Sequence, residues 1–181
     1  MNRKPNEAKE DKLLKKVVAK DKKAFEELYE LTSQSIFFYL YRLLQNRESV
    51  EDIHVEVYAT VWKSACRFQG KSKVKTWMFG IARNLALNEL RKKYRETNSI
   101  DRPIKDEDST KALNGFERKQ HIQEALMKIS AKHREIIDLA FFHEASYAEI
   151  SQLLEIPENT VKTRVYYAKA ALKEMLVKME L

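Results

Sequence analysis

One short block of the sequence, residues 68–95, combines clustered positive charge with aromatic rings. Its eight lysines and arginines face a single acid, Glu89, and this excess of +7 equals the formal net charge of the whole 181-residue chain. Clustered cations attract phosphates, and aromatic faces can stack on unpaired bases, at about 1–3 kcal/mol per base. The block therefore indicates binding of single-stranded nucleic acid through these rings: Phe68, Trp77, Phe79 and Tyr94. A buried amphipathic helix with a solvated basic end would give the same pattern, and the block alone does not separate the two interpretations.

Residue types that carry enzymatic chemistry form no recognisable site. The sequence has no glycine-rich phosphate loop and no H-E-x-x-H motif. A single cysteine, Cys66, excludes an internal disulfide and a cysteine-based metal cluster. We therefore predict no catalytic residues, no metal site and no cofactor. The scattered histidines fit surface or edge positions better than a site: His54, His121, His133 and His143.

The bulk composition restricts the partner and the compartment. A sequence pI near 9.3 suggests a polyanionic partner, either nucleic acid or an anionic membrane surface. No apolar run approaches the ~20 residues that a membrane span needs. The charged N-terminus also lacks the apolar stretch of a signal peptide. We expect a cytoplasmic protein without membrane insertion.

The elements that must position the basic block are predicted to be helices. Only three glycines and three prolines are present, which leaves little material for hairpin turns. Residues 97–116 are polar, contain Pro103 and Gly115, and show no apolar period, as in a linker. The sequence thus predicts an all-α chain with two small helical domains, 1–96 and 117–181, joined by a flexible linker at 97–116.

Within the first domain, residues 1–10 are expected to fray, and a short helix follows. Asp21 is predicted to cap a long second helix, which could break near Ser33 or Ser35. Ser49 is predicted to start the third helix, with Asp52 three residues later in a capping-box-like arrangement. The expected buried face of this third helix is made by Val50, Ile53, Val57 and Val61.

Two acids on the third helix share another face, because Asp52 and Glu56 stand four residues apart. Like charges at this spacing destabilise an isolated helix by roughly 0.2–0.5 kcal/mol. The pair is either simply solvated or an acidic patch for a basic partner.

The basic block itself begins with a predicted loop, Gly70 to Lys73. A helix is expected from there to about Arg95. Its predicted apolar face consists of Val74, Trp77, Met78, Ile81 and Leu85.

The second domain ends in a helix-turn-helix pattern. Ser146 and Glu149 form an S-x-x-E capping box, and a short turn at residues 155–158 precedes the last helix. The first residues of such a second helix enter the DNA major groove; an ordinary helical pair with a solvated polar face is the alternative. Because residues 117–181 hold ten cations and ten acids, this domain should bind DNA weakly unless tethered. The candidate base-reading residues are Asn159, Thr160, Lys162, Thr163, Arg164, Tyr166 and Tyr167.

Four segments together resemble the extracytoplasmic-function (ECF) sigma factors, the small initiation subunits of bacterial RNA polymerase. They follow the order and spacing of that family over nearly the whole chain. The segments are AFEELY, VEDIHVEVYATVW, FQGKSKVKTWMFGIARNLALNELR and SYAEISQLLEIPENTVKTRVYYAKAAL.

The resemblance implies a role for each domain. The first resembles sigma region two, in which Asp52 and Glu56 would dock on the clamp helices of the largest polymerase subunit. The second resembles region four, which reads the minus-thirty-five element as duplex and lies at the polymerase flap. The loop from Phe68 to Thr76 would capture a flipped base of the minus-ten element, because an extruded base needs a pocket. The implied single-strand contacts are Phe68, Lys71, Ser72, Lys73, Thr76, Trp77, Arg83 and Asn84.

The implied partners are core RNA polymerase, promoter DNA and an anti-sigma factor. The sequence departs from the family at Val55, where Gln is frequent, at Asn159, where Gly is frequent, and at Tyr167, where Arg is frequent. The promoter sequence therefore cannot be copied from relatives. A stand-alone helix-turn-helix regulator is the alternative, but the neutral second domain argues against tight binding without polymerase.

Overall fold

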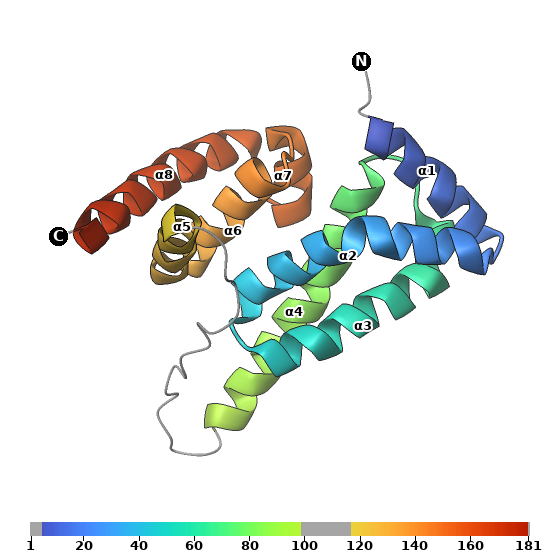
Figure 1. Ribbon diagram of the computed structural model, residues 1–181, viewed down its shortest axis with the longest axis horizontal. Coiled ribbons are helices and arrows are strands. Elements are labelled where there is room, and N and C mark those ends of the chain that lie inside the picture. Colours follow the sequence, from blue (N-terminus) through green and yellow to red (C-terminus); the bar gives the residue numbers. More distant parts are fainter. Residues whose placement is uncertain (1–4, 99–116, 181) are drawn as a thin grey trace. The chain divides into compact units, whose positions relative to one another are not determined.

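The computed structural model describes residues 5–98 and 117–180, and these are helical with no strands (Figure 1). The chain divides into two compact units, Met1–Lys105 and Asp106–Leu181. The predicted linker falls almost entirely on residues 99–116, which lie outside the described residues.

Unit one begins with α1 (Pro5–Val18), earlier than the sequence suggested. The expected fraying is wrong from Pro5 onward, because Leu13, Leu14 and Val17 bury this helix against the unit. Proline also suits the first helical position, where its missing N–H is no loss. Val18, the last residue of α1, is 44% exposed.

The second helix, α2 (Lys22–Leu44), is capped as predicted. The Asp21 carboxylate accepts a hydrogen bond from the backbone N–H of Ala24 at 3.1 Å. No break occurs at Ser33 or Ser35, and the helix ends at Gln45 in the left-handed conformation (φ 52°). Together, α2, α3 (Arg47–Ser64) and α4 (Val74–Asn98) enclose the core of unit one. Its fully buried side chains include Leu28, Ile36, Tyr39, Leu40, Val50, Val57 and Met78.

The start of α3 differs from the prediction. Asn46 is the cap, and its side-chain oxygen accepts from both the backbone N–H and the hydroxyl of Ser49, each at 2.9 Å. Ser49 is therefore inside the first turn rather than ahead of it. Asparagine caps a helix as well as serine does, so the helix begins after Asn46 and is about one turn longer than predicted. The predicted apolar face is confirmed, since its four members are buried.

Helix α4 runs three residues beyond the expected end at Arg95. Its buried face also differs from the predicted one. Val74 and Met78 are buried as expected, but the face continues through Ala82 and Ala86. Small side chains allow α4 to pack closely against α2 and α3, and this packing turns the larger residues partly outward. The half-buried residues are Trp77, Ile81 and Leu85.

Unit two is a set of shorter helices. These are α5 (Glu117–Lys128), α6 (Ala131–Ile137), the π-helical turn η2 (Asp138–Phe142), α7 (Tyr147–Leu154) and α8 (Glu158–Glu180). Ser130 caps α6 through the backbone N–H of His133, at 3.3 Å. The π turn interrupts the regular helical repeat here, and Leu139 is fully buried while Ala140 is half-buried. Ile122 of α5 is 40% exposed.

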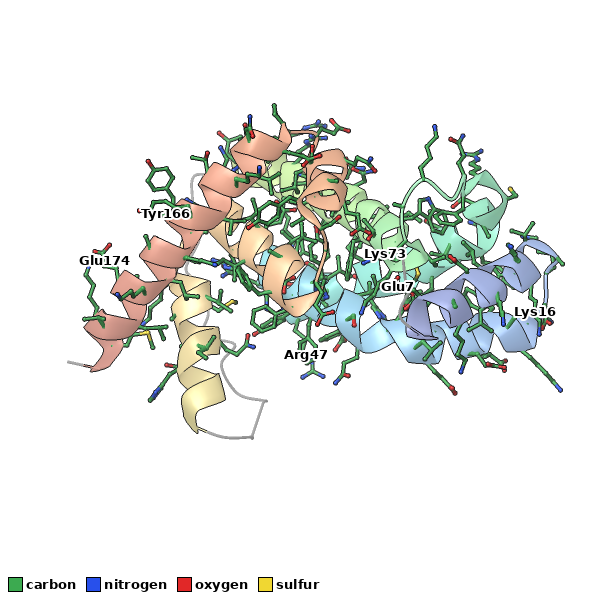
Figure 2. All side chains as sticks on the ribbon, turned by 90° about the horizontal axis from the view of Figure 1, so that it is seen from above. Glu7, Lys16, Arg47, Lys73, Tyr166 and Glu174 are labelled. Atoms are coloured by element: carbon green, nitrogen blue, oxygen red, sulfur yellow. The ribbon has the colours of Figure 1, made fainter. Side chains whose placement is uncertain are left out.

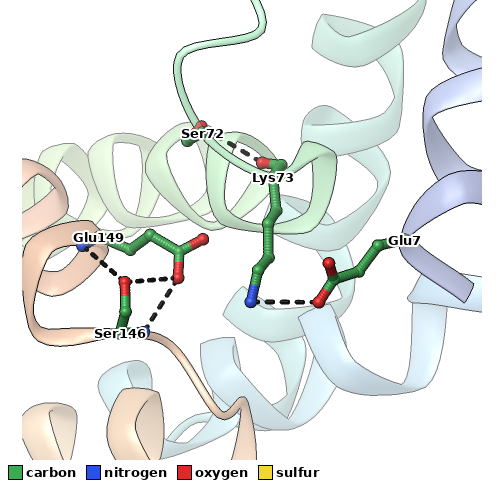
Figure 3. A network of polar contacts seen from close by, with 5 residues as sticks. All are labelled: Glu7, Ser72, Lys73, Ser146 and Glu149. Atoms are coloured by element: carbon green, nitrogen blue, oxygen red, sulfur yellow. Dashed lines mark hydrogen bonds and ion pairs between the residues drawn. The ribbon is translucent and has the colours of Figure 1, made fainter. Parts of the chain in front are cut away.

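The helix-turn-helix of unit two is formed by α7 and α8. The capping box is confirmed: the Ser146 hydroxyl accepts from Glu149 N–H at 3.2 Å, and Ser146 N–H donates to the Glu149 carboxylate at 2.9 Å (Figure 3). The turn follows at Glu155, which has a left-handed φ of 55°. Val161 and Val165 then bury one face of α8.

Arg134 is a buried side chain that connects two helices and that the sequence did not indicate. Its guanidinium donates to the carbonyls of Leu126 (2.8 Å), Met127 (2.9 Å) and Ile129 (3.0 Å), at the end of α5. A helix leaves its last carbonyls without partners inside the helix, and Arg134 supplies those partners. Burial lowers the pKa of Arg134.

Among the helices of residues 5–98 and 117–180, none has the length and apolar character that a membrane span requires.

One buried titratable group in unit one has a predictable effect on stability. His54 was expected at a surface or edge position, but it is only 8% exposed, and its Nε2 lies 3.2 Å from the Ser33 carbonyl oxygen. Burial lowers the pKa of His54. The folded state therefore binds fewer protons than the unfolded state, so the free energy of unfolding falls as the pH drops below about 6.5.

We expect a His54→Phe variant to lose much less stability than the wild type when the pH is lowered from about 7.5 to about 5.5. Phenylalanine preserves an aromatic ring beside Tyr29 and Tyr58 but takes no proton. Both tryptophans, Trp62 and Trp77, belong to unit one, so urea unfolding followed by tryptophan fluorescence reports on this unit. Equal pH slopes in the two proteins would contradict the assignment.

Candidate nucleic-acid interface

The 68–73 loop joins η1 (Ala65–Arg67) to the first residue of α4. Phe68, at its start, packs on Trp77 in the first turn of α4, with ring centroids 5.4 Å apart and planes tilted by 54°. Gly70 has a left-handed φ of 69° and no atom near the position of a Cβ. The backbone conformation there favours glycine even though the space is open. The contact between Phe68 and Trp77 thus connects the start of the loop with the first turn of α4.

The predicted single-strand contacts differ in how much solvent they meet. Lys71 and Asn84 are exposed. Thr76 is only 8% exposed, so its side chain offers little surface to a strand, and we remove it from the predicted contacts. The half-buried members, which present one side to solvent, are Phe68, Ser72, Lys73, Trp77 and Arg83.

The start of α4 adds positive charge from the backbone. The N–H of Trp77 donates to the Lys73 carbonyl at 3.0 Å, so the earlier N–H groups cannot bond within the helix. Helix N-termini of this kind attract phosphates. Lys71, Lys73 and Lys75 surround this end. The arrangement can hold a backbone phosphate beside an exposed aromatic surface.

One contact at this loop was missed by the sequence reasoning. The Lys73 ammonium lies 3.2 Å from the Glu7 carboxylate of α1 (Figure 3). The two residues are far apart in sequence, and no motif links them. The early start of α1 would have been the only signal.

The acidic pair on α3 faces solvent. Asp52 and Glu56 are both exposed, while Ile53 and Val57 bury the opposite side of the helix. Between the two acids stands Val55, which is 71% exposed. An apolar side chain flanked by two carboxylates is a surface that can meet a basic and partly apolar partner.

In unit two, the predicted base-reading residues lie on the outer face of α8. Tyr166 and Tyr167 are 70% and 58% exposed, and their rings meet edge to face at 5.4 Å. Tyr166 projects away from its helix in Figure 2. Asn159, Lys162 and Thr163 are exposed, while Thr160 and Arg164 are half-buried. The Thr163 hydroxyl donates to the Asn159 carbonyl at 2.9 Å, which leaves chiefly its methyl group for a base.

A second exposed surface of unit two was not predicted. Phe141 and Phe142, in the π turn, are 49% and 42% exposed, and the Lys169 ammonium lies 4.7 Å from the Phe141 ring centre. Adjacent phenylalanines in a helical segment are ordinarily buried. The π turn instead rotates them outward.

Comparison with known proteins identifies the two units. The Sigma-70 region 2 family matches residues 28–96, and the Sigma-70 region 4 family matches residues 119–172. The ECF RNA polymerase sigma factor SigW of Bacillus subtilis is 29% identical, covering 91% of this chain and 95% of its own. The chain belongs to the ECF RNA polymerase sigma factors. It directs RNA polymerase to promoters in transcription initiation, and the family is not one of enzymes.

Two further relatives extend this ECF sigma factor assignment. The sigma factor SigK of Mycobacterium bovis is 28% identical and covers 92% of each chain. The solved sigma factor RpoE of Bartonella quintana, in complex with the anti-sigma factor NepR, has a TM-score of 0.76 at 27% identity. That match covers 85% of this chain and 97% of the other.

The matched segments of this sigma factor contain the predicted sites. The α3 acids and the 68–73 loop lie within the region 2 match, and residues 159–167 lie within the region 4 match. Helix α1 lies outside both.

Proposed function

We propose that this sigma factor holds the melted minus-ten strand at the start of α4 and reads the minus-thirty-five duplex with α8. The observation that carries the proposal is the convergence of the Phe68–Trp77 ring pair, the exposed Lys71 and the first backbone N–H groups at one end of α4. We further propose the domain limits 1–96 and 117–181, with residues 97–116 as the linker.

The single-strand role rests on matching chemistry. Unstacking a base costs a few kcal/mol, and stacking on an aromatic ring recovers about 1–3 kcal/mol. Trp77 is half-buried, so part of its ring anchors the helix while the rest can meet a base. Asn84 lies seven residues further along α4 and is exposed. Its amide offers both a donor and an acceptor to an unpaired base.

The duplex role rests on α8. Its exposed asparagine can pair with adenine, Lys162 and Arg164 can pair with guanine, and threonine methyl groups can contact thymine. Unit two is formally neutral over residues 117–181, so electrostatic attraction to the DNA phosphates contributes little to its binding. We therefore propose that unit two binds promoters because the polymerase and unit one tether it there.

We also propose that Asp52 and Glu56 dock on basic clamp helices of the largest polymerase subunit, with Val55 adding an apolar contact. Their shared exposed face on α3 supports this. The polymerase flap would contact unit two. An anti-sigma factor is a further proposed partner, since the related RpoE was solved with one. Because the protein would act on the polymerase inside the cell, we propose that it is cytoplasmic.

The minus-ten site is tested by removing two of its proposed strand contacts. We expect Trp77→Ala with Asn84→Ala to abolish most protein-dependent transcript starts, because the melted strand loses a stacking surface and a polar contact. Run-off transcription with core polymerase and a library of bacterial promoter DNA, with the starts sequenced, measures this. Starts that depend on the wild-type protein and share paired upstream motifs would also give the promoter.

The matched control is Asn88→Ala, one helical turn further along α4, where the side chain is also exposed. It should leave the starts unchanged. If no starts depend on the protein while it binds duplex tightly without polymerase, the proposal fails in favour of a stand-alone regulator.

Docking on the polymerase is tested by reversing the charge of the two acids. Asp52→Lys with Glu56→Lys should weaken binding to core polymerase at least about tenfold, because two attractive charge contacts become repulsive. Fluorescence anisotropy of the labelled protein, titrated with core polymerase, measures the affinity. Glu26→Lys with Glu30→Lys is the charge-matched control, since both acids are exposed on α2 at the same spacing. Equal losses in the two variants would reduce the effect to net charge.

The role of Tyr167 is tested by adding a positive charge at this position. Replacing it with Arg should add one phosphate contact and steepen the dependence of log affinity on log salt by about 0.9. Binding of the full-length protein to a duplex carrying the minus-thirty-five element, measured at several salt concentrations, tests this. Ala170→Arg, exposed one turn later on α8, is the control. An unchanged slope for Tyr167→Arg would show that this position does not approach the backbone.

A further inference from the structure

Helix α1 lies outside the segment that matches region 2, yet it packs against both η1 and α4. These are the two elements that flank the 68–73 loop. Two acids of α1, Glu7 and Glu10, reach residues at the start of α4. Figures 2 and 3 show Glu7 of α1 beside Lys73.

Glu10 is buried at this junction, with 7% exposure. Its carboxylate accepts a hydrogen bond from the backbone N–H of Lys75, the second residue of α4. That N–H lies in the first turn, where a helix has no carbonyl of its own to offer. Glu10 therefore acts as an N-terminal cap for α4, supplied by a helix more than sixty residues earlier in the chain.

The cost of burying Glu10 argues that the contact is specific. Burial raises the pKa of Glu10, and the nearby Lys75 charge counteracts part of that rise. An apolar residue would fill this place without the desolvation cost, but it could not accept the Lys75 N–H.

Glu7 acts one turn further toward the N-terminus and on a side chain rather than on the backbone. Its carboxylate lies 3.2 Å from the Lys73 ammonium, with the two side chains 20% and 38% exposed. The Ser72 hydroxyl donates to the Lys73 carbonyl at 3.2 Å in the same turn of chain (Figure 3). Lys73 is thus held at the last position of the loop.

We propose that Glu7 and Glu10 are positioning residues, which fix the 68–73 loop and the first turn of α4 in the conformation that receives the unpaired promoter base. This inference rests on the minus-ten role proposed above. It extends the functional unit to α1, which contacts no DNA in this scheme.

The first test reads the position of the loop in the free full-length protein. Amide hydrogen exchange, followed by NMR, should be about tenfold faster at Lys75 in Glu10→Ala, because the acceptor is lost. Glu10→Gln keeps an acceptor oxygen and should restore protection to within about twofold of the wild type. Glu30→Ala, an exposed acid on α2, is the matched control. Equal exchange in Glu10→Ala and the wild type, or equal acceleration in Glu10→Gln, would overturn the capping role.

The second test reads function through a double-mutant cycle, and it stays valid even if Glu10→Ala fails to fold. Glu7→Gln should lower initiation by about three- to tenfold in the wild-type background, and by less than about 1.5-fold when Lys73 is already Gln. Initiation is measured by run-off from a promoter found with the wild-type holoenzyme. Equal losses in both backgrounds, or none in either, would overturn the role of Glu7.

The two proposals can fail separately. If Trp77→Ala with Asn84→Ala initiates normally, the minus-ten role fails, whatever the exchange data show. If that variant is inactive while Glu10→Ala and Glu7→Gln initiate like the wild type, the minus-ten role stands and the positioning role is overturned.

Discussion

The first backbone N–H groups of α4 cannot find partners inside their own helix, and much of unit one is organised around that fact. Packing in the core fixes where α4 begins, through Val74 and Met78. Glu10 of α1 accepts a hydrogen bond from one of these groups, the N–H of Lys75, and its side chain is buried there. The surrounding lysines and the Phe68–Trp77 pair make the same end of the helix attractive to a phosphate and a base. One helix start thus serves both folding and, in the proposed function, promoter melting.

Charge is divided unequally between the two units, and this division determines how they can share the work. The basic block of residues 68–95 carries an excess equal to the net charge of the chain, whereas residues 117–181 are neutral. Electrostatic attraction to DNA falls steeply with salt, so a neutral unit gains little from it. In the proposed function, the linker and the polymerase hold the two units together, so that two modest contacts combine through effective concentration. Selectivity would then depend on both promoter elements being present at the right spacing.

Capping and periodicity rules predicted much of this structure, but they failed where packing against neighbouring helices determines the outcome. The caps at Asp21 and Ser146 were correct because a side chain and a backbone N–H three residues apart suffice to form them. The start of α3 was wrong because two good capping residues compete and sequence does not rank them. The buried face of α4 was wrong at Ala82 because alanine carries little hydrophobic signal, although it permits the closest packing. The Glu10 contact could not be predicted, since nothing local connects residue 10 with residue 75.

The most direct test of the central claim is site-specific photocrosslinking from Lys71, the exposed lysine of the 68–73 loop. A photoreactive amino acid would be placed at this position, and the holoenzyme bound to a promoter identified by run-off transcription. We predict crosslinks to one strand of the minus-ten element, and only under conditions in which the DNA is melted. Crosslinks to upstream duplex, or to polymerase instead of DNA, would contradict the account.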